Sequence, residues 1–508
     1  MIRLRLSLLV VAVGLLLSAA PDASGFVFTA TRKKVTNIAD HFTRHPAPDK
    51  KAKKVVFLSR AGHEGVLPPF EFEDTFDFDG SGNDFASGSP PSPACPTCAD
   101  VADIDNPTNV YLWTKSSNEV SQLTFSESGG DGANRWPEID SRGDWVAWDS
   151  DRDHVPGAPG NADANGEIFL ARVSTGTITQ VTDTIGGGAD ANRRVAIGDK
   201  GDVLVFESTR DFASVPSCSM PDETTSCANA DGNAEIMVYE PEGARLMQLT
   251  ATTGDTAGVA NIRARVSVDG RFVVFQSTRD PGATPAAGTI CTGLDDVSAC
   301  ANVDGSSEIF LYDRKDRDLT QVTSTGAGLC GGEDANQRAD VSKKGKYVVF
   351  QSKCEDELNA GGCGACDANN EIFVVARKKQ EIHQVTLSDA GRNRFPRIAS
   401  TGAYIAFQSD RSYVGENVAH EDALYLLRRS SLAASGFLTS RTQLLEDAIL
   451  SGGGTLQNPV ARVTVPNFTG GFDTDIDRIG LSGNGQFLLF HNGKDVTNQE
   501  TWLVDRKK

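Results

Sequence analysis

The sequence lacks the short motifs that mark several common enzyme classes. Its 508 residues contain no Gly-x-Ser-x-Gly nucleophile elbow, no His-Glu-x-x-His pair and no phosphate-binding Gly-x-x-x-x-Gly-Lys loop. These absences argue against an attached serine peptidase domain, a metalloprotease of that type and a P-loop enzyme. The seven histidines are scattered along the chain, so a histidine-based site would have to be assembled from distant loops.

Positive charge is also scarce, because 49 Lys and Arg residues face 68 Asp and Glu residues and the formal net charge is −19. A chain of this charge disfavours nucleic acids and anionic membranes, which bind basic surfaces. We therefore expect no nucleic-acid partner.

Long apolar runs are confined to the N-terminus. Arg3 and Arg5 precede "LSLLVVAVGLLLSAA", and the small residues of "SAAPDASG" follow. This order is typical of a secretory signal peptide, which we place at residues 1–25. A retained anchor is the alternative, although the run is short for a membrane span. We expect an exported protein, periplasmic or extracellular, with no membrane span in the mature chain.

A repeated unit dominates the rest of the sequence. One copy contains four β-rich runs, "RVAIG" (194–198), "VLVFES" (203–208), "EIMVYE" (235–240) and "RLMQLT" (245–250), separated by turns and one long loop. Alignment finds the unit seven times, and short β-branched and aromatic runs between Gly, Asp and Ser are typical of antiparallel strands. Tandem four-stranded units predict an all-β fold, a seven-bladed β-propeller, as a single domain over residues 26–508.

The two ends of the chain complete the predicted ring. The seventh unit stops after three strands, and "RKKVTNI" (32–38) resembles the missing fourth strand. An N-terminal strand in the last blade would remove two exposed sheet edges. Six blades with a separate end module is the alternative, and would leave residues 32–38 unpaired with the last blade. Residues 431–458 are predicted to be an insertion between the third and fourth strands of blade six.

These units resemble the TolB-like propeller repeats, which are related to the WD-repeat superfamily. The family pattern has a Ser-x-Asp-Gly turn, an apolar strand ending in Phe-x-Ser, a strand with Ile-Tyr or Ile-Phe, and a final Leu-Thr. "VSVDGRFVVFQSTRD" (266–280) and "EIFLYDRKDRDLTQVT" (308–323) match it well. The resemblance implies exported proteins that bind proteins or envelope components, but also propellers attached to peptidases and a few glycan lyases. The loops between second and third strands are longer here, and they contain cysteines that the pattern does not require.

The ten cysteines indicate disulfides in an exported chain. Three pairs share the spacing Cys-x8-Cys in equivalent loops, which favours identical roles. For the pair in "CPTC", a redox or zinc motif is the alternative. The predicted bridges are Cys218–Cys227, Cys291–Cys300, Cys354–Cys363, Cys330–Cys366 and Cys95–Cys98.

An acidic pattern precedes the third strand of four units, with Asn, Asp, Asn or Ser, and Glu at alternate positions. Ca²⁺ binds six to eight oxygens of such side chains, so calcium is the cofactor that the pattern suggests. The alternative is that Asx turns cap the loop and the glutamate binds backbone at the strand start. The candidate calcium ligands are Asn161, Asp163, Asn165, Glu167, Asn229, Asp231, Asn233, Glu235, Asn302, Asp304, Ser306, Glu308, Asp367, Asn369 and Glu371.

The leading functional interpretation is an exported, non-catalytic binding or scaffold propeller. It would recognise a protein or a cell-envelope glycan through its long, disulfide-braced loop face, and no catalytic residue is assigned. One alternative is a metal-dependent glycan-active or hydrolytic enzyme with its site in the central channel, where His63, His154 and His420 could meet. A calcium-braced structural surface protein is the third interpretation.

Overall fold

The computed structural model describes eighteen stretches of the chain, and the structural account concerns these alone. They are residues 29–34, 43–59, 74–77, 108–125, 134–155, 160–186, 188, 191–254, 260–281, 290–294, 299–325, 335–353, 369–386, 392–410, 423–429, 460–462, 479–492 and 500–506. The predicted signal peptide (1–25) and insertion (431–458) lie outside them.

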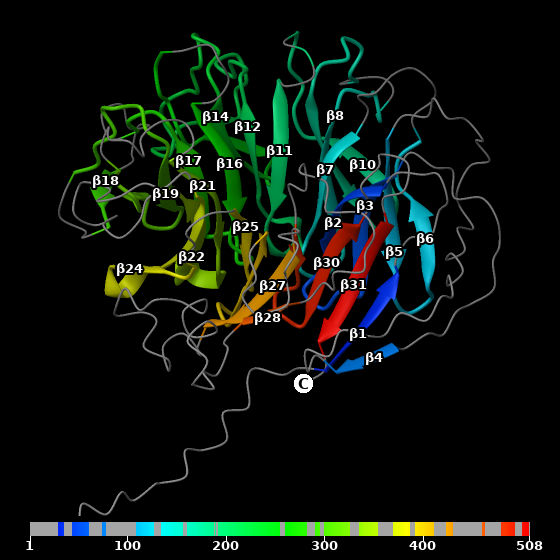
Figure 1. Ribbon diagram of the computed structural model, residues 1–508. Helices are drawn as coiled ribbons and strands as arrows, with labels where there is room; N and C mark the ends of the chain where they lie inside the picture. The colour runs from blue at the N-terminus through cyan, green and yellow to red at the C-terminus, as the bar shows by residue number, and fades with distance from the viewer. Residues whose placement is uncertain are drawn as a thin grey trace, which may run out of the picture.

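The strands form seven sheets, and each sheet packs against the next so that they close a ring around a central axis (Figure 1). Blade 1 contains β2 (Thr43–Pro48), β3 (Lys54–Ser59), β5 (Asn109–Thr114) and β6 (Glu119–Gln122). Blade 2 contains β7 (Asn134–Ile139), β8 (Trp145–Ser150), β9 (Glu167–Arg172) and β10 (Thr177–Gln180). Blade 3 contains β11 (Asn192–Ile197), β12 (Leu204–Ser208), β14 (Glu235–Glu240) and β15 (Arg245–Gln248).

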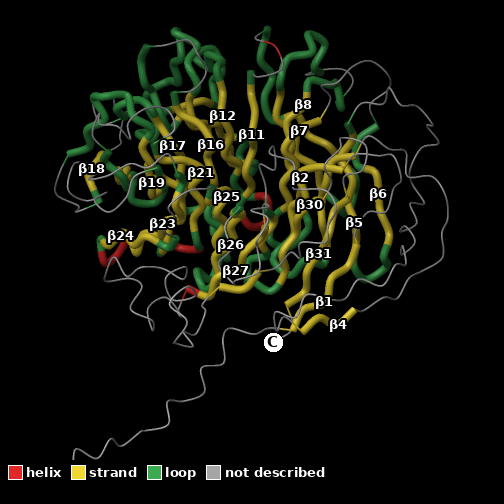
Figure 2. Tube along the Cα trace, viewed as in Figure 1, coloured by secondary structure: helices red, strands yellow, loops and turns green. Residues whose placement is uncertain are grey.

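The remaining blades follow the same order. Blade 4 contains β16 (Asn261–Val266), β17 (Phe272–Ser277), β19 (Glu308–Asp313) and β20 (Asp318–Gln321), and blade 5 contains β21 (Asn336–Val341), β22 (Tyr347–Ser352), β23 (Glu371–Ala376) and β24 (Glu381–Gln384). Blade 6 contains β25 (Asn393–Ile398), β26 (Tyr404–Ser409), β27 (Ala423–Arg428) and β28 (Val460–Arg462). Short 3-10 turns lie between strands at η2 (Asp199–Gly201), η3 (Lys343–Gly345) and η4 (Arg377–Lys379), and strands and loops make up most of the described chain (Figure 2).

The last blade joins both ends of the chain, as predicted. Its strands are β29 (Gly480–Leu481), β30 (Phe487–Asn492), β31 (Glu500–Arg506) and β1 (Thr29–Lys34), with β4 (Asp74–Asp77) outside β1. Strand β1 is antiparallel to β31, with Arg32 opposite Val504, and the two lie side by side in Figure 1. The strand begins and ends a few residues earlier than the predicted 32–38. Strand β28 likewise supplies the fourth strand of blade 6 after the predicted insertion.

Apolar packing between blades follows from the repeated Phe-x-Ser and Ile-Phe strands. The second and third strands of five blades place two aromatic rings opposite each other, with ring centroids 5.6–5.8 Å apart. Such stacked pairs add roughly 0.5–1.5 kcal/mol beyond the burial of their area. The pairs are Phe57–Tyr111, Trp148–Phe169, Phe275–Phe310, Phe350–Phe373 and Phe407–Tyr425.

Two of the predicted disulfides lie in the described residues, and both are formed. Cys218–Cys227 and Cys291–Cys300 each close a loop between the second and third strands of their blade. These loops also carry short strands, β13 (Cys218–Ser219) and β18 (Ile290–Gly293), which run parallel to β15 and β20 at the outer edges of blades 3 and 4. The braced loops therefore cover sheet edges, and disulfides of this kind persist in oxidising compartments.

The other three predicted bridges cannot be compared with the structure, because they involve residues that it does not describe. They are Cys354–Cys363, Cys330–Cys366 and Cys95–Cys98. Among the described residues, no helix is long and apolar enough to span a bilayer.

Removal of β1 should open the ring. A chain that starts at residue 39 leaves β31 without its outer neighbour, because the ladder between Ala30–Lys34 and Trp502–Arg506 is lost. We expect a melting temperature lower by roughly 5 °C or more and a stronger tendency to associate through the exposed edge. Thermal melts and size-exclusion chromatography test this, with a chain starting at residue 26 as control. Equal melts for the two chains would contradict the closure.

Candidate functional site

The glutamate that ends the acidic pattern is a buried hydrogen-bond acceptor. In blade 2, Oε1 of Glu167 accepts hydrogen bonds from the backbone N and the hydroxyl of Thr184, at 2.7 and 2.6 Å. Its Oε2 accepts one from Nδ2 of Asn192, at 3.1 Å. Burial raises the pKa of the carboxyl, and the hydrogen bonds from threonine oppose that shift. Glu167 therefore joins the start of β9 to the start of β11 in the next blade.

The same bond recurs around the ring. The glutamate opening the third strand of one blade accepts a hydrogen bond from the asparagine opening the first strand of the next blade, at 3.0–3.1 Å. The asparagine amide also donates to backbone of the preceding blade in three cases. The pairs are Glu167–Asn192, Glu235–Asn261, Glu308–Asn336 and Glu371–Asn393.

The remaining members of the acidic pattern close the loop itself. Nδ2 of Asn161 donates to the carbonyl of Asn165 at 2.8 Å, and Oδ2 of Asp163 accepts a hydrogen bond from the backbone N of Gly186 at 2.6 Å. Blade 3 repeats both contacts with Asn229 and Asp231. In blade 4, Asn302 and Asp304 make loop-closing hydrogen bonds to Ser306. Turn-capping contacts are thus present, while Asp367 lies outside the described residues, and calcium binding stays a prediction.

A bulge follows two residues after each of these asparagines. In six blades the third residue of the innermost strand has a positive φ of 50–57°, and the register to the second strand shifts there. Such bulges interrupt the alternation of side chains and re-aim one of them. We call these residues the bulge ring: His45, Trp136, Arg194, Arg263, Arg338 and Phe395.

The preceding blade stabilises this unusual backbone. The backbone N–H of Arg194 donates to Oδ1 of Asp149 at 3.1 Å, and that of Phe395 donates to Oε1 of Gln351 at 3.1 Å. Glu207 and Gln276 accept the equivalent bonds from Arg263 and Arg338. A residue other than glycine in the left-handed (αL) conformation costs on the order of 1 kcal/mol of folding free energy. It persists only where surrounding contacts hold the backbone in place. The acidic or amide residue before the strand-ending serine is therefore an inter-blade acceptor.

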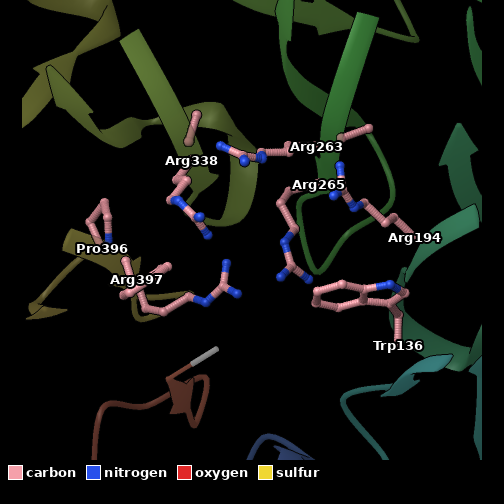
Figure 3. A pocket seen from close by; sticks show the side chains of 10 residues that line it. Trp136, Arg194, Arg263, Arg265, Arg338, Pro396 and Arg397 are labelled. Carbon is pink, nitrogen blue, oxygen red and sulfur yellow. The ribbon is translucent and has the colours of Figure 1, made fainter. Parts of the chain in front are cut away.

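Five of the six bulge-ring residues, all except His45, line a pocket in the central channel. The pocket is lined by Trp136, Arg194, Arg263, Ala264, Arg265, Arg338, Ala339, Phe395, Pro396 and Arg397. We call it the arginine pocket, because five arginines from four blades line it. Figure 3 shows the guanidinium groups of Arg265, Arg338 and Arg397 directed toward a common space, with the indole of Trp136 at its border.

Two aromatic rings, Trp136 and Phe395, flank the arginines of the pocket. The guanidinium of Arg194 lies 5.6 Å from the ring of Trp136, and that of Arg338 lies 4.2 Å from the ring of Phe395. The imidazole of His45 packs edge-on against Trp136, with ring centroids 4.3 Å apart. The result is a wall of cationic groups and flat apolar faces.

A second cavity continues the channel below the arginine pocket. It is lined by both acidic and basic side chains. Arg265 and Arg397 line both cavities, and Arg265 forms an ion pair with Glu138 of the lower one. Nε of Arg397 donates to the carbonyl of Ile479 at 3.1 Å.

Of the three loop histidines considered from the sequence, His154 alone is described. It packs edge-on against Trp148 and Phe169, and its Nε2 lies 2.8 Å from Oδ1 of Asn134 and 3.0 Å from Oγ of Ser150. Burial lowers the pKa of His154 to about 4. It is therefore a neutral, partly buried residue that supports the start of β7, while His63 and His420 lie outside the described residues.

Sequence reasoning missed the bulge ring, although a signal for it exists. In five units the ring residue follows the asparagine of the innermost strand by two positions, as in "NRW" (134–136), "NRR" (192–194) and "NRF" (393–395). The asparagine is the same in these five units, whereas the residue two positions later is Trp, Arg or Phe. A variable position inside a repeated frame was the available indication of a site.

Comparisons with known proteins agree with the fold. No family model and no curated protein matches the sequence. An oligogalacturonate lyase from Vibrio parahaemolyticus is similar in structure, with a TM-score of 0.48, 10% identity and coverage of 95% of this chain and 98% of that chain. TolB from Acinetobacter baumannii has a TM-score of 0.35 and 15% identity, covering 63% of this chain and 57% of that chain. The propeller domain of a Pyrococcus furiosus protease has a TM-score of 0.44 and 8% identity, covering 92% of this chain and 97% of that chain. The chain has a TolB-like β-propeller fold.

The leading functional interpretation of the sequence, a non-catalytic protein that is not an enzyme, is corrected by this comparison. The propellers similar over most of the chain include oligogalacturonate lyases, one of them in complex with manganese. The interpretation relied on missing contiguous motifs, but a channel site is assembled from side chains of several blades. Identities of 10% and 12% show the fold alone, so any functional argument must come from this chain's own residues.

The partly buried His154 should make the protein sensitive to acid. Its pKa is about 4 in the fold and 6.5 ordinarily, so the unfolded chain binds the proton first as the pH falls. The contribution of the neutral imidazole to the free energy of unfolding is complete above pH 6.5. It decreases by on the order of 2–3 kcal/mol as the pH falls to 4. Urea unfolding of the wild type and of His154→Gln at pH 8, 6 and 5 tests this. The difference between the two should shrink on acidification, and parallel profiles would contradict it.

Proposed function

We propose that the protein is an exported, glycan-active enzyme that binds an anionic saccharide in the arginine pocket. The carrying observation is the gathering of five arginines in one channel pocket of a chain whose formal net charge is −19. Glu207 and Glu138 already pair with Arg194 and Arg265, and an anion bound between the guanidinium groups would supply a counter-charge to the other three arginines as well.

The side-chain types of the pocket match a saccharide that carries carboxylates. Guanidinium groups bind carboxylates through two parallel hydrogen bonds, and Arg263, Arg338 and Arg397 approach from neighbouring blades. Trp136 and Phe395 add flat apolar surfaces that suit the C–H faces of a sugar ring. Oligogalacturonate, the substrate in the name of two similar structures, is a ligand of this class and serves as the probe.

The proposal assigns no metal-dependent step to the channel. In the described part of the chain, no three His, Cys, Asp or Glu side chains come together as a metal site. His45 is the histidine of the bulge ring, and its neighbour Trp136 offers no metal ligand. The described residues of the channel therefore do not fit a manganese or similar ion, and the proposed role of the pocket is substrate binding and orientation.

Loss of two pocket arginines should strongly weaken anion binding. Hydrogen bonds to charged groups contribute about 1.5–3 kcal/mol, so Arg263→Gln with Arg338→Gln should weaken trigalacturonate binding by roughly 100-fold or more. Isothermal titration calorimetry on the purified chain measures the affinity, and reducing-end or absorbance assays measure turnover.

The matched control is Arg317→Gln. Arg317 forms an ion pair with Glu223 on the exterior and lines neither cavity, so its replacement should leave affinity and turnover unchanged. No binding of trigalacturonate to the wild type, or equal binding to the double variant, would overturn the proposed function.

We also propose that calcium braces the loops before the third strands of blades 2 to 4. In the described part of the chain, the amide oxygens of Asn161 and Asn165 are buried and have no hydrogen-bond partner, and the same holds for Asn229, Asn233 and Asn302. A buried acceptor without a partner costs about 1–3 kcal/mol, and oxygen is the ligand that Ca²⁺ prefers. The glutamate oxygens already accept hydrogen bonds, so the ligands would be the asparagines with the intervening aspartates.

Calcium should then raise the melting temperature. We expect roughly 5 °C between EDTA and millimolar Ca²⁺ for the wild type. The shift should shrink in Asp231→Ala combined with Asp304→Ala, although both variants also lose loop-closing hydrogen bonds. Thermal melts with metal analysis test this. Coincident wild-type melts without bound metal would mean that water occupies these oxygens.

A further inference from the structure

We propose that the ion pair between Glu138 and Arg265 makes the arginine pocket selective for anionic ligands. The inference rests on the proposed function, because it concerns the ligand of the same pocket. Glu138 forms an ion pair with the guanidinium of Arg265, which the ligand would also contact. A ligand therefore gains Arg265 only when its own negative group replaces the carboxylate of Glu138.

The ion pair joins two blades that are not neighbours in the ring. Glu138 lies on β7 of blade 2 and Arg265 on β16 of blade 4, and the two side chains are in direct contact. Both residues follow the bulge of their strand by two positions, and Ala196 occupies the equivalent position on β11 between them. The methyl side chain of Ala196 leaves room for the two long side chains to meet in front of blade 3.

Arg265 belongs to both cavities, whereas Glu138 lines only the lower one. The ion pair therefore forms the boundary between the arginine pocket and the lower channel. Both side chains are largely buried, with 20% of Arg265 and 17% of Glu138 exposed. Contact with Glu138 keeps the guanidinium at the bottom of the arginine pocket in a fixed position.

Replacement of Glu138 by a ligand group at Arg265 distinguishes charged from neutral ligands. A carboxylate at the bottom of the pocket restores a charge-assisted contact to Arg265 when Glu138 is displaced. A neutral sugar hydroxyl would leave Arg265 without its charged partner, which is a large penalty for a mostly buried group. Glu138 thus acts as a competitor that anionic ligands overcome and neutral ligands do not, and rejection of wrong ligands by unpaired charge is a general route to specificity.

The variant Glu138→Gln tests the competition. It keeps the shape of the side chain and removes the charge, so trigalacturonate should bind about five- to tenfold more tightly than to the wild type. The affinity for neutral galactotriose should stay equally low in both. Arg265→Gln should weaken trigalacturonate binding, and adding Glu138→Gln to it should have no further effect.

Two further variants keep the test decisive. Glu240→Gln removes an ion pair with Arg314 that lines neither cavity, and it should leave both affinities unchanged. If Glu138→Gln does not fold, as judged by circular dichroism and thermal melting, Glu138→Asp keeps the charge but shortens the side chain. We then expect a smaller gain in affinity of about two- to threefold.

The outcomes separate this inference from the proposed function. Failure of wild-type protein to bind trigalacturonate overturns the proposed function. Binding that depends on Arg338 but is unchanged by Glu138→Gln, and by Glu138→Asp, overturns the competition alone. Tighter binding of both the charged and the neutral trisaccharide to Glu138→Gln would show that Glu138 blocks the pocket by size, and this too overturns the inference.

Discussion

The hydrogen bond between a buried glutamate and the asparagine that opens the next blade is the contact on which the described part of the propeller depends. It joins the third strand of one blade to the innermost strand of the following one, four times between blades 2 and 6. Apolar packing alone holds two sheets together but lets them slide, because it has no direction. The directional bond fixes the height at which each innermost strand enters the channel, and therefore the height of the bulge residue two positions later.

Repeated and variable residues consequently have different tasks. The repeated asparagine, glutamate and strand-ending serine build the frame, and the acceptor on the second strand holds the bulge backbone, as Asp149 does for Arg194. The bulge position itself is free to vary, and it holds His, Trp, Arg or Phe in different blades. These side chains also touch across blades, as Arg194 does with Trp136, but the bonds that hold the bulge use backbone N–H groups. A repeat protein can therefore change its ligand by substituting these side chains.

Periodicity and spacing predict most of the fold. The strand order, the closure by an N-terminal strand and the bridges of Cys218 and Cys291 follow from the repeat and are present. The site did not follow, for two physical reasons. Its side chains come from several blades, far apart in sequence, and the bulge breaks the alternation by which strand residues are assigned to a face. The residues of the acidic pattern make the hydrogen bonds that close the loops and join the blades. Calcium binding by these residues remains a prediction.

Net charge misleads about such a channel because electrostatic interactions in salt solution are local. At physiological ionic strength, exposed charges more than about 8 Å apart are largely screened. The acidic exterior thus disfavours nucleic acids, which need a broad basic surface. The proposed anionic saccharide would instead meet Arg194, Arg263, Arg265, Arg338 and Arg397 at short range. A formal net charge of −19 is therefore compatible with a local pocket lined by five arginines.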